Sequence, residues 1–141
     1  VYRVSIATGE PTQVTFDKES AAFASWSPDG RRISFGLNRG EDSRVGIIPR
    51  EGGESTILVL DRGQNWPFSW SPDGREIAFA GLRNGAWNIY SVNVQTRKQT
   101  QWTGYRSPAS YTRYPSWSPK NDQIVYEYAE VKGNIVLLDL E

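Results

Sequence analysis

Few side chains in this 141-residue sequence could carry catalysis, because histidine, cysteine and methionine are all absent. Without histidine or cysteine there is no Ser-His-Asp or Cys-His catalytic pair, no disulfide and no thiolate nucleophile. Carboxylates such as Asp42, Asp61 and Glu127 could form an acid–base pair of the glycosidase kind, but their spacing singles out no two of them. The sequence also lacks a nucleophile elbow, a Walker loop and a Gly-x-Gly-x-x-Gly segment. We therefore expect a protein that is not an enzyme and that has neither a metal site nor a cofactor.

Aromatic and arginine side chains are the residue types that stand out. Six Trp, seven Tyr and five Phe make up 13% of the chain. Segment 103–115 alone holds three tyrosines and two arginines and no acidic residue. Tyr, Trp and Arg dominate the energetics of protein interfaces, because they combine a large contact area with directional hydrogen bonds. These residues predict a protein-binding surface, and the candidates are Trp66, Arg83, Trp87, Tyr105, Arg106, Tyr111, Arg113 and Tyr114.

The same arginine–aromatic contacts could have a purely structural role, in which they fasten a long connecting segment onto the fold. The residue types do not separate this alternative from a binding role, so both stay open.

The charge balance excludes other classes of partner. Sixteen basic and sixteen acidic residues give a net charge of zero, whereas nucleic-acid-binding domains are usually basic. No apolar run approaches the roughly 20 residues of a membrane-spanning helix.

The chain begins with Val1, so we expect a processed or partial piece of a longer protein.

An internal repeat indicates which elements position these residues. Trp-Ser-Pro-Asp-Gly occurs at 26–30 and 70–74, and a degenerate copy, Trp-Ser-Pro-Lys-Asn, occurs at 117–121. An apolar-x-aromatic step starts seven residues after each tryptophan. Proline presets φ for a tight turn, aspartate can bond the following backbone, and glycine accepts a positive φ. Asparagine tolerates the left-handed conformation, so we expect the third turn to form as well.

Each repeat predicts four short strands, A to D in chain order, with no helical periodicity. Four antiparallel strands at a period in the forties are typical of a β-propeller blade. A β-sandwich is the alternative, but it has no reason to repeat a turn sequence in register. The tryptophans at positions 26, 70 and 117 are expected to lie in the core between adjacent blades.

The predicted fold is all-β, with about three blades' worth of strands in a partial, open propeller. Residues 1–22 supply strands C and D of a first blade, and residues 23–61 and 62–103 form complete blades. Residues 104–141 supply strands A to C of a fourth. Such a piece does not close on itself, so the remainder of the propeller is expected from the same chain or another one.

The stretches WSPDGRRISF and WSPDGREIAFAG, the second followed by NIYSVNVQTRKQTQWT, resemble the PD40 (WD40-like) repeat of TolB-like β-propellers. These propellers are usually six-bladed. The resemblance implies a bacterial, non-catalytic interaction scaffold in the periplasm or cell envelope. It would bind a protein partner through the face formed by its B–C and D–A loops. A peptidoglycan-associated lipoprotein or a subunit of a membrane complex is the implied partner.

Two alternatives stay open on the resemblance alone. The chain could be a gating propeller segment of a prolyl-oligopeptidase-like peptidase. It could also be a structural accessory subunit of a larger envelope or membrane complex.

Overall fold

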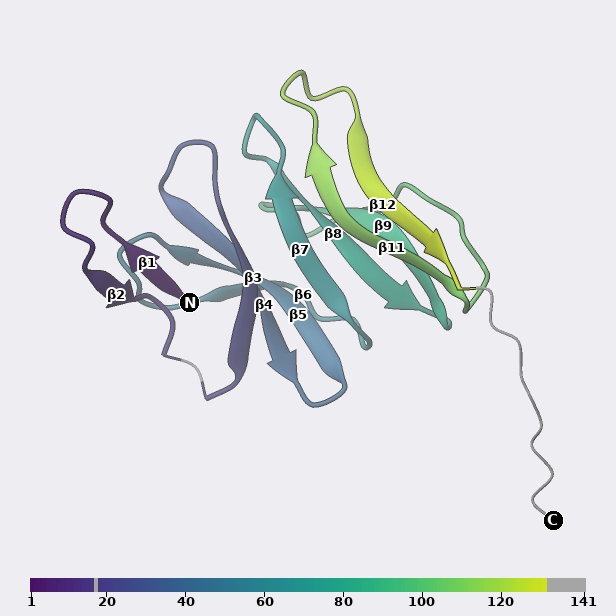
Figure 1. Ribbon diagram of the computed structural model, residues 1–141, viewed down its shortest axis with the longest axis horizontal. Helices are drawn as coiled ribbons and strands as arrows, with labels where there is room; N and C mark the ends of the chain where they lie inside the picture. Colours follow the sequence, from purple (N-terminus) through teal and green to yellow (C-terminus); the bar gives the residue numbers. More distant parts are fainter. Residues whose placement is uncertain (17, 132–141) are drawn as a thin grey trace, which may run out of the picture.

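The computed structural model describes residues 1–16 and 18–131, which form four antiparallel sheets and no helix (Figure 1). The first sheet pairs β1 (Tyr2–Val4) with β2 (Pro11–Gln13). The second contains β3 (Ser20–Trp26), β4 (Arg32–Arg39), β5 (Asp42–Pro49) and β6 (Thr56–Val59). The third contains β7 (Asn65–Trp70), β8 (Glu76–Arg83), β9 (Ala86–Asn93) and β10 (Gln99–Gln101). The fourth pairs β11 (Ser110–Trp117) with β12 (Ile124–Glu130).

The sheets are arranged as successive blades of a propeller that the described residues do not close (Figure 1). In blades two and three the strands are hydrogen-bonded in chain order, so A to D correspond to β3–β6 and β7–β10. The A strands β3, β7 and β11 contact one another from blade to blade. The predicted all-β fold with four-stranded antiparallel blades is confirmed. The third strand expected in blade four falls on residues 132–141, outside the described residues.

The repeated Ser-Pro-Asp-Gly segments form the predicted A–B turns. In blade two the Ser27 hydroxyl donates to the Asp29 carboxylate at 2.6 Å, and the Arg31 amide donates to the same oxygen at 3.0 Å. Gly30 closes the turn with a φ of 65°. The hydrogen bond from Ser27 is the main reason that the pKa of Asp29 is lowered, and the same arrangement in blade three lowers the pKa of Asp73. These aspartates are bonded within their turns.

The degenerate third turn also forms, with a different carboxylate. Asn121 takes the left-handed conformation at a φ of 62°, in place of glycine. The Ser118 hydroxyl donates to Asp122 at 2.7 Å, two residues beyond the position that aligns with Asp29. The turn therefore survives the loss of the aspartate.

The core lies between blades and is built largely from the residues of the repeat. Ile77 and Phe79 of the apolar-x-aromatic step on β8 point toward blade two, where Val45 and Val59 cover them. The full set of buried residues between blades two and three is Val45, Ile47, Leu58, Val59, Trp70, Ile77, Phe79, Tyr90 and Val92. Each blade therefore buries one face against the blade before it.

The three repeat tryptophans are not equally buried. Trp70 is 6% exposed and its indole N–H donates to the Ser25 carbonyl of blade two at 3.2 Å. Trp117 is half-buried, whereas Trp26 is 48% exposed. The prediction of a core position is therefore wrong for Trp26. The reason is that this side chain faces the preceding blade, and in the described residues only the two-stranded β1–β2 sheet lies there.

No helix in the described part of the chain is long and apolar enough to cross a membrane.

Candidate functional site

The structure separates the predicted binding residues into two groups. One group belongs to a connected cluster of rings, here called the aromatic surface: Phe23, Trp66, Phe68, Tyr111 and Tyr114 lie on A strands, and Trp87 lies on β9. Trp87 is buried, at 7% exposed, so it supports the outer rings and does not face solvent. The other group, Arg83, Tyr105 and Arg106, lines a pocket beside β9. The sequence predicted one protein-binding surface, and the fold places its residues in two separate regions.

The aromatic surface is held together by ring contacts between neighbouring blades. The Trp66 ring lies 4.4 Å from Trp87 and 5.5 Å from Phe23, measured between ring centroids. Trp87 stacks in turn on Tyr111 of blade four at 6.4 Å. A second row passes through Phe68, which lies 5.2 Å from Phe23 and 5.1 Å from Tyr114. The rings thus span three A strands without a gap.

One arginine completes this surface. The Arg113 guanidinium lies 5.9 Å from the Tyr111 ring and 5.5 Å from the Tyr114 ring, within cation–π range. It also pairs with Glu127 on β12 at 3.5 Å. Tyr111 and Tyr114 are 39% and 54% exposed, so these rings face solvent. The patch therefore combines aromatic area with a guanidinium that is paired to Glu127.

Phe23 and Phe68 belong to the surface but were not among the predicted residues. The repeat held a signal for Phe23, because Phe23 and Tyr114 both lie three residues before a repeat tryptophan. Phe68 lies two residues before Trp70 and has no aromatic counterpart at that offset. Its position in the surface depends on the packing of neighbouring blades.

Phe23 and Tyr114 have an unusual backbone. Their φ values are 55° and 52°, and in each case the pairing of the A strand with its neighbour shifts register at this point. A left-handed conformation costs a residue with a side chain about 1–2 kcal/mol. Pro67 occupies the matching position in blade three, where its ring excludes a positive φ. Strain of this kind concentrates at functional sites, so the two bulges add support to the aromatic surface as a binding site.

Glycine and alanine substitutions at two positions test this backbone strain. We expect Tyr114→Gly to be about 1 kcal/mol more stable than Tyr114→Ala, because glycine adopts a positive φ without steric cost. Tyr111 lies on the same strand in regular pairing with Ala129, so there the order should reverse and alanine should be the more stable substitute. Urea denaturation of the four variants measures the differences. The same order at both positions would contradict the strain.

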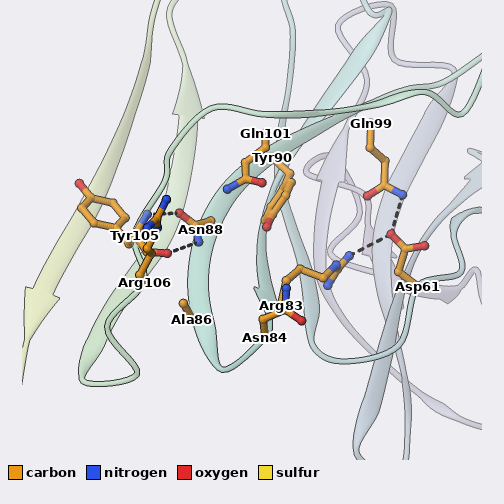
Figure 2. Close-up of a pocket in the computed structure, with 10 residues that line it drawn as sticks. All are labelled: Asp61, Arg83, Asn84, Ala86, Asn88, Tyr90, Gln99, Gln101, Tyr105 and Arg106. Atoms are coloured by element: carbon orange, nitrogen blue, oxygen red, sulfur yellow. Dashed lines mark hydrogen bonds and ion pairs between the residues drawn. The ribbon is translucent and has the colours of Figure 1, made fainter.

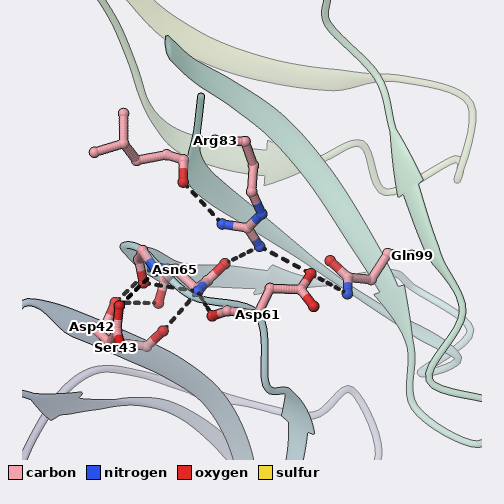
Figure 3. A network of polar contacts seen from close by, with 8 residues as sticks. Asp42, Ser43, Asp61, Asn65, Arg83 and Gln99 are labelled. Carbon is pink, nitrogen blue, oxygen red and sulfur yellow. Dashed lines mark hydrogen bonds and ion pairs between the residues drawn. The ribbon is translucent and has the colours of Figure 1, made fainter. Parts of the chain in front are cut away.

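Arg83 occupies a network of polar contacts at the end of β8 (Figure 3). Its side chain is 19% exposed and donates to the Leu82 carbonyl, the Asp61 carboxylate and the Asn65 side-chain oxygen. Asn65 is buried and its amide nitrogen donates to the Ser43 carbonyl at 2.7 Å. Arg83 thereby links the D–A segment before blade three to the B–C turn within it.

The B–C connections of blades two and three are turns of two residues. Arg83 pairs with Ala86, so only Asn84 and Gly85 lie between β8 and β9. Both have positive φ, 51° and 76°, as a type I′ hairpin turn requires. This Asn-Gly pair matches the twist of the two strands, so two residues suffice for the connection.

Tyr105 is fixed by contacts on both sides. Its hydroxyl shares a hydrogen bond with that of Tyr126 at 2.8 Å, which is the main reason that the pKa of Tyr126 is raised. Its ring stacks on Tyr128 at 4.7 Å. The side chain of Asn88 bonds both the backbone N–H and the carbonyl of Tyr105, at 2.7 and 3.0 Å. The D–A segment after blade three is therefore held firmly against β9.

The second site is a pocket of about 540 Å³ on the blade-two side of β9, here called the interblade pocket (Figure 2). Ala86, Asn88 and Tyr90 alternate along β9 and so point to one face of the sheet. The complete lining is Asp61, Arg83, Asn84, Ala86, Asn88, Tyr90, Gln99, Gln101, Tyr105 and Arg106. Elsewhere in residues 1–16 and 18–131, as in this pocket, no three acidic side chains gather as a metal site would require.

Comparisons with known proteins agree on the family of this fold. A family model described as "PD40: TolB beta propeller domain" matches residues 1–141. No curated protein matches the sequence. The structure is similar to that of a putative TolB from Agrobacterium tumefaciens, with a TM-score of 0.75 and 21% identity over 92% of this chain and 50% of that one. It is also similar to TolB from Acinetobacter baumannii, with a TM-score of 0.77 and 20% identity over 94% of this chain and 33% of that one. The chain therefore spans half or less of the length of these proteins.

Proposed function

This chain belongs to the TolB β-propeller family, whose repeat is PD40, and from that premise we propose that it is a non-catalytic scaffold that binds a protein partner. The partner would dock on the face formed by the B–C turns and D–A segments, with the aromatic surface at the centre of the contact. The proposed function is argued from the blades that the structure describes. Any activity of a complete propeller also belongs to the proposal.

The continuity of the aromatic surface across three A strands is the observation that supports the proposal most strongly. Trp66 and Tyr111 lie close to the D–A ends of β7 and β11, and Trp87 lies close to the B–C turn. Solvent-exposed rings beside an arginine have the composition of interface hot spots. A patch spread over several strands suits a macromolecular partner, because small ligands are usually enclosed in concave sites.

The family membership supports a bacterial envelope setting for this interaction. We propose a periplasmic location and a partner such as a peptidoglycan-associated lipoprotein or a subunit of a membrane complex. The gating-propeller and accessory-subunit alternatives would place the same surface against a fixed neighbouring domain instead of a separate partner.

The proposal can be tested with a triple variant of the aromatic surface. Surface plasmon resonance would measure binding of the chain to an immobilised, purified peptidoglycan-associated lipoprotein. We expect Tyr111→Ser, Arg113→Gln and Tyr114→Ser together to weaken binding by about a hundredfold, because these three side chains are exposed and suited to a hot spot. The thermal midpoint should change by only a few degrees.

A matched control removes two exposed rings and one arginine elsewhere: Tyr2→Ser, Phe16→Ser and Arg31→Gln. This control should bind like the wild type. Absence of wild-type binding would overturn the proposed partner, and equal binding by both triple variants would overturn the proposed surface.

A further inference from the structure

The interblade pocket borders the B–C turns and D–A segments but contains none of the aromatic-surface residues, and hydrogen bonds fix several of its walls. Five segments of the chain line it: the end of blade two at Asp61, the β8–β9 turn, strand β9, strand β10 and the segment after β10. Its volume of about 540 Å³ lies within the range of about 300–1,000 Å³ typical of ligand sites. It is separate from the aromatic surface, because Trp87 points to the opposite face of β9 from Asn88.

Internal hydrogen bonds hold several of the lining side chains in place, although not that of Arg106, which is exposed. Figure 2 shows Gln99, Asp61 and Arg83 joined in a row on one side of the pocket, with distances of 2.7 Å and 3.3 Å. On the other side Asn88 bonds the backbone of Tyr105. A ligand would therefore meet a preorganised site, which reduces the entropy lost on binding.

After these internal bonds are made, several polar groups of the lining still have hydrogen-bonding capacity for a ligand. Gln99 and Gln101 donate their amide nitrogens to Asp61 and to the Thr103 carbonyl, so their amide oxygens still have acceptor capacity. The Tyr90 hydroxyl has no hydrogen bond within the described residues. Arg106 has neither an ion pair nor a hydrogen bond to the part of the chain that is described. The pocket thus presents one guanidinium without an ion pair, that of Arg106, beside several oxygen acceptors.

The charge of the pocket favours a single negative group. Asp61 is its only carboxylate, and Arg83 and Gln99 both bond it. Arg106 is therefore the charge that remains without a counterion among the lining residues. A phosphate suits this arrangement poorly, because its oxygens are acceptors and would face the amide oxygens.

Stacking ligands are also disfavoured. The Tyr90 ring is stacked against Phe79 at 5.4 Å, and the Arg83 guanidinium lies 5.5 Å from it. The Tyr105 ring is stacked on Tyr128. The Tyr90 ring is therefore already occupied by Phe79 and Arg83, and one face of Tyr105 is covered, which leaves little ring area for a stacking base.

We propose that the interblade pocket binds a peptide carboxylate. Arg106 would pair with the carboxylate, and the oxygens of Gln99, Gln101 and Tyr90 would accept hydrogen bonds from adjacent backbone N–H groups. A chain end combines both features, because its anion is flanked by amide donors. An acidic side chain in an extended peptide carries the same chemistry, and the experiment distinguishes the two sources.

Nuclear magnetic resonance of the ¹⁵N-labelled full chain tests this inference with three probes. The first is N-acetyl-trialanine with a free C-terminal carboxylate, the second is the same tripeptide as its C-terminal amide, and the third is N-acetyl-Ala-Asp-Ala amide. We expect saturable shifts of the Gln99 and Gln101 side-chain amide signals with a carboxylate probe, and about tenfold weaker binding of the neutral amide. Tighter binding of the first probe assigns the pocket to a chain end, and tighter binding of the third assigns it to an acidic side chain.

Two variants complete the experiment. Arg106→Gln should weaken carboxylate binding by about tenfold, whereas Arg31→Gln, which removes an exposed arginine far along the chain, should leave it unchanged. The aromatic-surface triple variant should also bind the probe like the wild type, so failure here is distinguishable from failure of the proposed function. Equal binding of charged and neutral probes, no binding, or an unchanged affinity in a folded Arg106→Gln variant would overturn the inference.

Discussion

Replacing Trp70 with alanine should lower the free energy of unfolding by about 3–5 kcal/mol, the range typical of large-to-small substitutions of a buried aromatic residue. Trp70 is 6% exposed, packs into the core between blades two and three, and donates a hydrogen bond to Ser25 across the interface. The Arg32 guanidinium also lies 5.1 Å from its ring. Removing the indole leaves a cavity where two blades meet, and leaves the Ser25 carbonyl without this partner.

Trp26→Ala provides the matched control. Trp26 begins the same pentapeptide one repeat earlier but is 48% exposed, so its loss should cost about 1 kcal/mol. Urea denaturation followed by circular dichroism gives both values, and an unchanged m-value would show that the denatured state is not affected. Equal losses at the two positions would contradict the interblade role of Trp70.

Replacing Asn65 with alanine should cost about 2–4 kcal/mol, because it leaves several buried polar groups without partners. The amide nitrogen of Asn65 donates to the carbonyls of Ser43, Gly63 and Asp61, at 2.7, 3.1 and 3.2 Å. Its side-chain oxygen accepts from Arg83 (Figure 3). The substitution therefore removes the side-chain hydrogen bonds that link the D–A segment to Ser43 and Arg83, while the backbone bonds of the segment remain.

Asn38→Ala serves as the control for this prediction. Asn38 makes one solvent-exposed hydrogen bond, to the Ser20 hydroxyl at 3.2 Å, and its loss should change the free energy of unfolding by no more than about 0.5 kcal/mol. Chemical denaturation measures both variants. Hydrogen exchange of the amides in residues 61–65 adds a local readout, since protection there should fall in Asn65→Ala. Unchanged protection and stability would show that the network contributes little.

The fold could be predicted largely from the repeat because its signals are local. A Ser-Pro-Asp-Gly segment selects a tight turn through the backbone preferences of its own residues, and the short apolar run from Ile77 to Phe79 selects a buried strand. Even the degenerate turn at Asn121 followed from the tolerance of asparagine for positive φ.

The candidate site could be predicted only in part. Aromatic and arginine composition pointed to Trp66, Trp87 and Tyr111, which do lie in contact. Composition does not reveal that Arg83 is hydrogen-bonded inside a network, nor that Phe68 joins rings from two other blades. Those facts depend on which strands become neighbours.

The absence of histidine and cysteine, the blade period and the turn chemistry are properties of the sequence alone, since they depend on residue types and on preferences over a few positions. Burial is different, because it depends on what packs against a side chain. Trp26 and Trp70 share one local sequence, but Trp70 faces a complete four-stranded blade and Trp26 faces a two-stranded sheet. Only the tertiary structure decided which tryptophan is core, which rings form one surface, and that Arg106 lines a pocket.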